Sequence, residues 1–123
     1  MPITRRLAAA AAVSLLAVSG VPSAVAKDGD VRVAGSCTGS ATAKLKLSHE
    51  DGRIETEFEV DQNRNGVTWR VTVAHNGVRR VTTRATTKAP SGSFEVRRLL
   101  PDRSGQDRIS ARAVSPGGQV CTV

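Results

Sequence analysis

The sequence predicts an all-β protein, a small antiparallel β-sandwich of about seven to eight strands held by one disulfide. Three observations lead to this prediction. Apolar and polar residues alternate with a period of two, as in strands with one buried face. Clusters of Gly, Pro, Asn and Asp separate the alternating stretches, as turns do. Two cysteines, Cys37 and Cys121, permit one crosslink.

The first 26 residues have the plan of a secretory signal peptide. A pair of arginines precedes an apolar run over about 7–18, and the triplet at 24–26 is a small-x-small cleavage site. We therefore expect cleavage after Ala26, a secreted (extracellular) protein without membrane attachment, and a single domain over residues 27–123. The arginine pair suits the general secretory route and the twin-arginine route equally.

Both cysteines follow the predicted leader and would meet an oxidising compartment, which favours a structural disulfide between Cys37 and Cys121. They are 84 residues apart, so the crosslink would bring the first strand region beside the last. Closing a loop of this length stabilises the folded state by about 4–5 kcal/mol in the chain-entropy treatment.

The alternating stretches are short and frequent. In each of them, apolar residues occupy one phase and polar residues occupy the other. The apolar phase is made of Val, Leu, Ile and Ala, together with Phe58, Trp69 and Phe94. The pattern predicts an antiparallel sandwich of immunoglobulin-like shape, or a small barrel. The stretches cover residues 31–33, 41–47, 53–60, 67–73, 93–96, 108–114 and 119–123.

The turn "AHNG" at 74–77 allows two registers for its hairpin. A two-residue Asn-Gly turn would pair His75 with Val78. A three-residue loop ending at Gly77 would pair Val71 with Val81 and keep the apolar face continuous. We favour the longer loop, with Gly77 in the left-handed position of a G1 bulge and His75 at the loop tip.

The stretch "DQNRNG" at 61–66 matches the front half of a calcium-binding loop, with Asp61, Asn63 and Asn65 as candidate ligands. The twelfth position of such a loop is a bidentate Glu, whereas here it is Thr72. One carboxylate beside an arginine is also a poor divalent-cation site. We therefore expect a turn, without a bound metal or cofactor.

As a turn, "DQNRNG" is predicted to close a hairpin between the strands on either side of it. That register pairs Phe58 with Trp69 on the buried face. On the outer face it places Glu57 opposite Arg70, so that Arg70 would be neutralised.

No catalytic signature is present: the sequence has no nucleophile elbow, no H-E-x-x-H and no phosphate-binding glycine loop. The histidines, His49 and His75, fall in predicted loops. We expect a protein that is not an enzyme.

The charge of the chain is unevenly distributed. After loss of the leader the chain has 16 basic and 11 acidic residues, with a net −3 over 27–61 and +8 over 62–123. Arg80 and Arg84 are predicted to project outward from one strand as a candidate anion-binding site. The matching partner is an anionic wall polymer, an acidic glycan or an acidic protein. Nucleic acid is not expected, because the aromatic residues are in core phase and leave no stacking platform.

A second function is possible for "RRLLPDRSGQ", residues 97–106, which connects two predicted strands. With Pro101 and Arg103, this segment is a candidate contact loop of an inhibitor of a secreted hydrolase. A third interpretation is a structural secreted protein with no defined ligand.

Together, the signal peptide, "GSCTGSATAKLKL", "GRIETEFEVDQNRNGVTWRVTVAHNG" and the terminal "DRISARAVSPGGQVC" resemble a group of small exported actinobacterial proteins of unknown function. The resemblance covers most of the predicted mature chain. It implies an immunoglobulin-like or fibronectin-like sandwich with a disulfide, and it implies no activity and no site residues.

Overall fold

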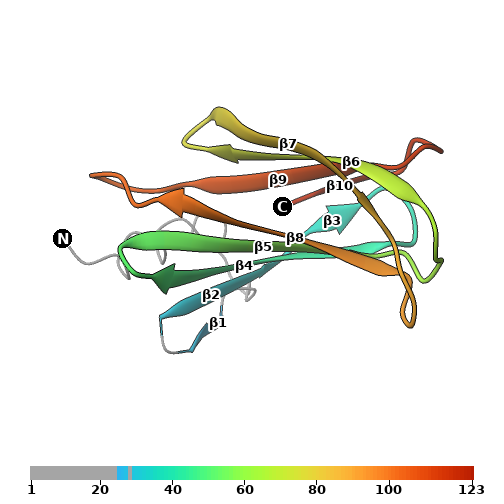
Figure 1. Ribbon diagram of the computed structural model, residues 1–123, viewed down its shortest axis with the longest axis horizontal. Coiled ribbons are helices and arrows are strands. Elements are labelled where there is room, and N and C mark those ends of the chain that lie inside the picture. Colours follow the sequence, from blue (N-terminus) through green and yellow to red (C-terminus); the bar gives the residue numbers. More distant parts are fainter. Residues whose placement is uncertain (1–24, 28) are drawn as a thin grey trace.

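The computed structural model describes residues 25–27 and 29–123, which form a sandwich of two antiparallel five-stranded sheets (Figure 1). The predicted leader, residues 1–26, lies outside the described residues except for Val25 and Ala26. Among the described residues, no helix is long and apolar enough to cross a membrane. The predicted sandwich is thus confirmed, and the strands do not close into the alternative small barrel.

Sheet 1 has the order β1-β2-β4-β5-β8, and sheet 2 has the order β3-β10-β9-β6-β7. Seven of the described strands have five or more residues, in agreement with the predicted seven to eight. The strands of sheet 1 are β1 (Val25–Lys27), β2 (Asp30–Ala34), β4 (Thr42–Glu50), β5 (Arg53–Asp61) and β8 (Ser93–Pro101). The strands of sheet 2 are β3 (Ser36–Cys37), β6 (Thr68–His75), β7 (Val78–Thr86), β9 (Ile109–Val114) and β10 (Val120–Thr122).

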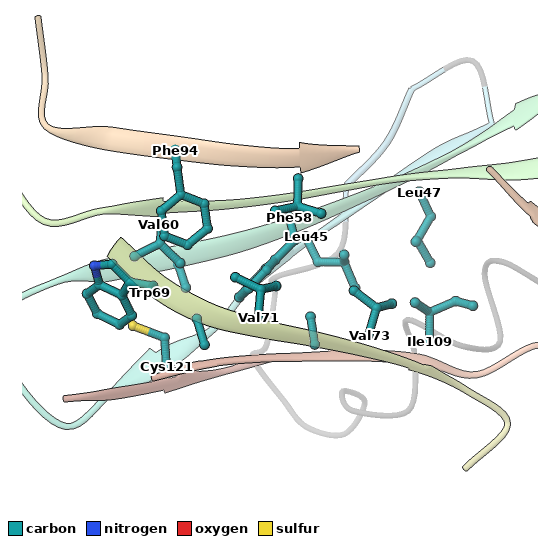
Figure 2. Packing of buried hydrophobic residues seen from close by; sticks show 14 of the residues in the cluster. Leu45, Leu47, Phe58, Val60, Trp69, Val71, Val73, Phe94, Ile109 and Cys121 are labelled. Atoms are coloured by element: carbon teal, nitrogen blue, oxygen red, sulfur yellow. The ribbon is translucent and has the colours of Figure 1, made fainter. Parts of the chain in front are cut away.

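The core lies between the sheets and is filled by the apolar phase of the longer strands, as the alternation predicts (Figure 2). The rings of Phe58 and Trp69, on opposite sheets, both contact Phe94, with centroids 6.5 Å and 6.1 Å away. The indole Nε1 of Trp69 donates to the side-chain oxygen of Gln62 at 3.0 Å, so its polar atom is satisfied. Other fully buried members include Ile54, Val60, Val71, Ala113 and Cys121.

The chain changes sheets at Gly35, between β2 and β3. A Cβ at this position would lie 2.5 Å from the carbonyl oxygen of Thr122, so only glycine allows the close approach. Just beyond it, Cys37 lies directly opposite Cys121 in the β3–β10 pair, and the two form the predicted disulfide. The first strand region therefore lies beside the last, as predicted. The disulfide also indicates an oxidising, non-cytoplasmic compartment.

The predicted hairpin around "DQNRNG" is wrong. Strand β5 pairs with β4 and β8, and β6 pairs with β7 and β9, so residues 62–67 cross from one sheet to the other. Phe58 is opposite Val96, and Trp69 is opposite Ala85. The alternation identifies the buried face of each strand, but it carries no information about which strand lies beside it.

The β6–β7 hairpin has the shorter of the two turns considered from the sequence. Asn76 and Gly77 have φ values of 52° and 81°, and His75 pairs with Val78, which describes a two-residue type I′ turn. The register then shifts between Val73 and Ala74. Val81 is opposite Val73, and the predicted pairing of Val71 with Val81 is wrong because Val71 is opposite Thr83. The predicted continuous apolar face is present, but a β-bulge on β7 produces it, not a three-residue loop.

Candidate functional site

The outer face of sheet 2 carries a cluster of arginines over three neighbouring strands. Arg70 on β6 lies directly opposite Arg84 on β7, and Arg112 on β9 lies opposite Thr72. Because Thr72 is two residues from Arg70, Arg112 is a diagonal neighbour of Arg70. A depression of about 480 Å³ forms between these strands, and its lining includes Arg70, Thr72, Arg79, Thr82, Arg84 and Arg112. We call this surface the arginine face.

No acidic residue lies on the three strands of the arginine face, β6, β7 and β9, and Glu59 and Glu95 of sheet 1 line a separate depression beside Arg84. Within the described part of the chain, Arg70, Arg84 and Arg112 form no ion pair. Like charges directly opposite each other in a ladder repel, so the Arg70–Arg84 pair is unfavourable without an anion.

The predicted neutralisation of Arg70 by Glu57 is wrong, because these residues belong to different sheets. Glu57 instead lies 3.9 Å from the Lys46 ammonium and 3.6 Å from the Arg97 guanidinium. Arg70 consequently joins the exposed cationic surface from which the sequence analysis excluded it.

The outer face of sheet 1 is also charged, but its cations and anions are paired. Lys44 lies 3.2 Å from Glu59, and Arg97 lies 3.5 Å from Glu55 and 3.7 Å from Glu95. Burial raises the pKa of the Glu95 carboxyl, and neighbouring carboxylates add to the effect. A depression of about 470 Å³ on this face is lined by groups of both signs, among them the paired Lys44 and Glu59.

The bulge on β7 changes which arginine accompanies Arg84. Arg79 pairs with Ala74, which is in phase with Arg70 and Thr72, so Arg79 lines the depression. Arg80 is the unpaired residue of the bulge and is not among the lining residues. Of the two predicted anion-binding residues, Arg84 lies on the arginine face and Arg80 lies beside it.

The "DQNRNG" crossover is a hydrogen-bonded turn. The Asp61 carboxylate accepts from the Asn63 backbone N–H at 3.0 Å, and Asn63 and Gly66 have φ values of 59° and 79°. Thr87 also stabilises this turn, because its hydroxyl donates to the Arg64 carbonyl at 2.6 Å. Asn65, the third candidate calcium ligand, is exposed in the same turn. Among the described residues no three His, Cys, Asp or Glu side chains gather as metal ligands do.

The β8–β9 connection, residues 102–108, holds the second predicted site. Pro101 is the last residue of β8 and pairs with Arg53, so it precedes the loop. Arg103 is exposed within the loop. Its backbone N–H donates to the Asp107 carboxylate at 3.2 Å.

Asp107 and His75 form a buried pair that the sequence analysis missed. The Nε2 atom of His75 donates to Oδ1 of Asp107 at 2.7 Å, and both side chains have 0% exposure. His75 is therefore in the interior and not at a loop tip as predicted. The available signal was its phase, since His75 continues the buried series Val71, Val73.

No protein-family model, curated protein or solved structure matches this chain.

Proposed function

We propose that the protein is an exported, non-catalytic binding module that holds an anionic polymer of the cell wall or extracellular surroundings on its arginine face. The observation that carries the proposal is the directly opposed pair Arg70–Arg84, with Arg112 as the diagonal neighbour of Arg70 and no acidic residue on the three strands. Secretion through a cleaved leader forms part of the proposal and agrees with the disulfide.

The geometry suits a phosphate or carboxylate group. A guanidinium presents a planar fork of N–H donors that bonds such groups through two parallel hydrogen bonds. Neighbouring strands are about 4.8 Å apart, so one anion can contact Arg70 and Arg84 together. The hydroxyls of Thr72 and Thr82, which are paired side by side, add neutral donors to the same surface.

A polyanion should bind this surface more tightly than a single anion does, because it can contact several arginines at once. Arg112 is displaced from Arg70 by one strand and two residues, a separation of about 7–8 Å between backbone positions. Successive charges along a polyanion would thus meet successive arginines. Binding of this kind weakens as salt rises, because exposed charges are screened over about 8 Å at physiological ionic strength.

The test compares retention of the parent and of arginine-to-glutamine variants on purified cell wall and on an acidic-glycan resin. Arg70→Gln combined with Arg84→Gln should elute at clearly lower salt than the parent. Arg80→Gln is the matched control for Arg84→Gln, because it removes the same charge from the same strand outside the depression. Elution of all variants at the parent's salt concentration, or equal loss in Arg80→Gln and Arg84→Gln, would show that the arginine face is not the binding surface.

A further inference from the structure

We propose that the β8–β9 connection is a second binding site, at which the protein inhibits a peptidase whose specificity pocket is acidic, with Arg103 as the residue that enters the pocket. This function is separate from the arginine face. It requires a loop that is exposed at its tip, fixed at its base and positively charged where the partner is negative.

The loop is exposed at its tip. Strand β8 ends at Pro101 and β9 begins at Ile109, and the connection extends beyond the strands at one end of the sandwich (Figure 1). Residues 103–106 are all exposed. Gly105 has a φ of 84°, which turns the chain back toward β9.

The base of the loop is fixed by three hydrogen bonds with the β6–β7 hairpin. Oδ1 of Asp107 accepts from His75 at 2.7 Å and also from the Arg103 backbone N–H at 3.2 Å. Next to it, the Asn76 backbone N–H donates to the Arg108 carbonyl, and the Arg108 N–H donates to the Asn76 side-chain oxygen, both at 2.8 Å. One carboxylate oxygen thus ties the backbone of Arg103 to the core of sheet 2.

A buried carboxylate is a costly means of stabilising a small protein. Apolar residues of similar volume often stabilise a fold as well as a buried charged pair does. They cannot, however, position the backbone of a neighbouring loop, whereas Asp107 positions that of Arg103. A loop already held in one conformation loses less entropy when it binds. The hydrogen bonds of Asp107 with His75 and with the Arg103 backbone therefore favour recognition by a partner.

The chemistry of the loop selects the partner. An exposed arginine on a fixed backbone matches a narrow pocket with a carboxylate at its base, because a desolvated guanidinium–carboxylate pair is strong and directional. Val78, 48% exposed on the hairpin to which the loop is clamped, offers apolar contact area on an adjoining element. A trypsin-like serine peptidase has this combination of acidic pocket and extended binding cleft.

The experiment measures inhibition of trypsin by the oxidised protein without its leader. We expect saturable inhibition that Arg103→Lys retains and Arg103→Gln weakens on the order of 100-fold, as for loss of a desolvated charge pair. Arg64→Gln is the matched control, because Arg64 is an exposed arginine in the β5–β6 crossover at the opposite end of the sandwich. Subtilisin, which lacks an acidic pocket, should be inhibited far less.

Asp107→Ala tests the fixed base of the loop, because it removes the oxygen that accepts from both His75 and the Arg103 N–H. The loosened loop should become a substrate, and mass spectrometry should find hydrolysis between Arg103 and Ser104 that the parent resists. If this variant does not fold, as judged by its thermal transition, the Arg103 series decides alone. The proposal fails if the parent does not inhibit at 100-fold molar excess, if trypsin cuts the parent at Arg103 as fast as a linear peptide, or if Arg103→Gln inhibits as well as the parent.

Discussion

Replacing His75 with alanine should be among the most damaging single substitutions in this protein. The change would leave the Asp107 carboxylate in a site where neither side chain of the pair is exposed. Removing the side chain that pairs with a buried carboxylate typically costs 3–5 kcal/mol, because the carboxylate is then left buried without its hydrogen-bond donor. Asp107 would keep the Arg103 N–H at 3.2 Å, which offsets part of that cost. We expect a loss of about 3–4 kcal/mol in the free energy of unfolding.

The opposite truncation should cost less. Asp107→Ala leaves a buried imidazole N–H without an acceptor, and an unsatisfied neutral donor costs about 1–3 kcal/mol. The double variant removes the isolated carboxylate together with its partner. Its loss should therefore be smaller than the sum of the two single losses, by an amount that measures the coupling of the pair.

Urea unfolding monitored by fluorescence checks these values, because Trp69 is the sole tryptophan and has 0% exposure. Both single variants and the double variant should be compared with the disulfide intact and with m values that stay unchanged. A loss below about 1 kcal/mol for His75→Ala would refute the reasoning, since it lies beneath the cost of any orphaned buried charge. Additive single effects would refute it equally.

Three further predictions concern other parts of the fold. Replacing Cys37 and Cys121 by alanine should lower the free energy of unfolding by about 4.6 kcal/mol, the chain-entropy value for a separation of 84 residues, and urea titration measures this loss. Burial, and next the neighbouring Glu57, raise the pKa of the Glu95 carboxyl. The native state therefore binds this proton more tightly than the unfolded state does, and stability is lost as pH rises from the ordinary glutamate pKa through the raised one. Glu95→Gln should therefore melt slightly above the parent at pH 7 and converge with it at lower pH; a gap that widens on acidification would contradict the sign. Gly92→Ala should cost about 2–4 kcal/mol, because a Cβ there overlaps the backbone of the β5–β6 crossover and the residue has a φ of 74°; a thermal melt near the parent's would contradict it.

The period-two pattern was sufficient to predict the core, because burial of a strand face depends on alternation alone. Leu45, Phe58, Val71 and the other apolar-phase residues point inward as expected. The pattern could not decide whether β5 and β6 are neighbours in one sheet or lie on opposite sides of the core. In both arrangements Phe58 and Trp69 face the same interior, so their sequence signature is identical.

The candidate sites were predicted only in part, because each depends on which strands are neighbours. Arg84 was correctly expected to point outward, whereas Arg70 was assigned a carboxylate partner that belongs to the other sheet. Arg80 does not line the depression, because it is the unpaired residue of the β7 bulge. No local residue pattern in the sequence predicts this bulge. The His75–Asp107 pair joins residues 32 apart in sequence, so only the folded arrangement brings them together.

The disulfide also determines how the domain would transmit mechanical force. Cys37 and Cys121 face each other on the paired strands β3 and β10, with Cα atoms 4.0 Å apart. Tension applied to the chain on either side of the crosslink would pass directly from one sulfur to the other and bypass the residues between them. Stretching could therefore extend only the chain outside the crosslink, while the arginine face and the β8–β9 loop kept their shape under load.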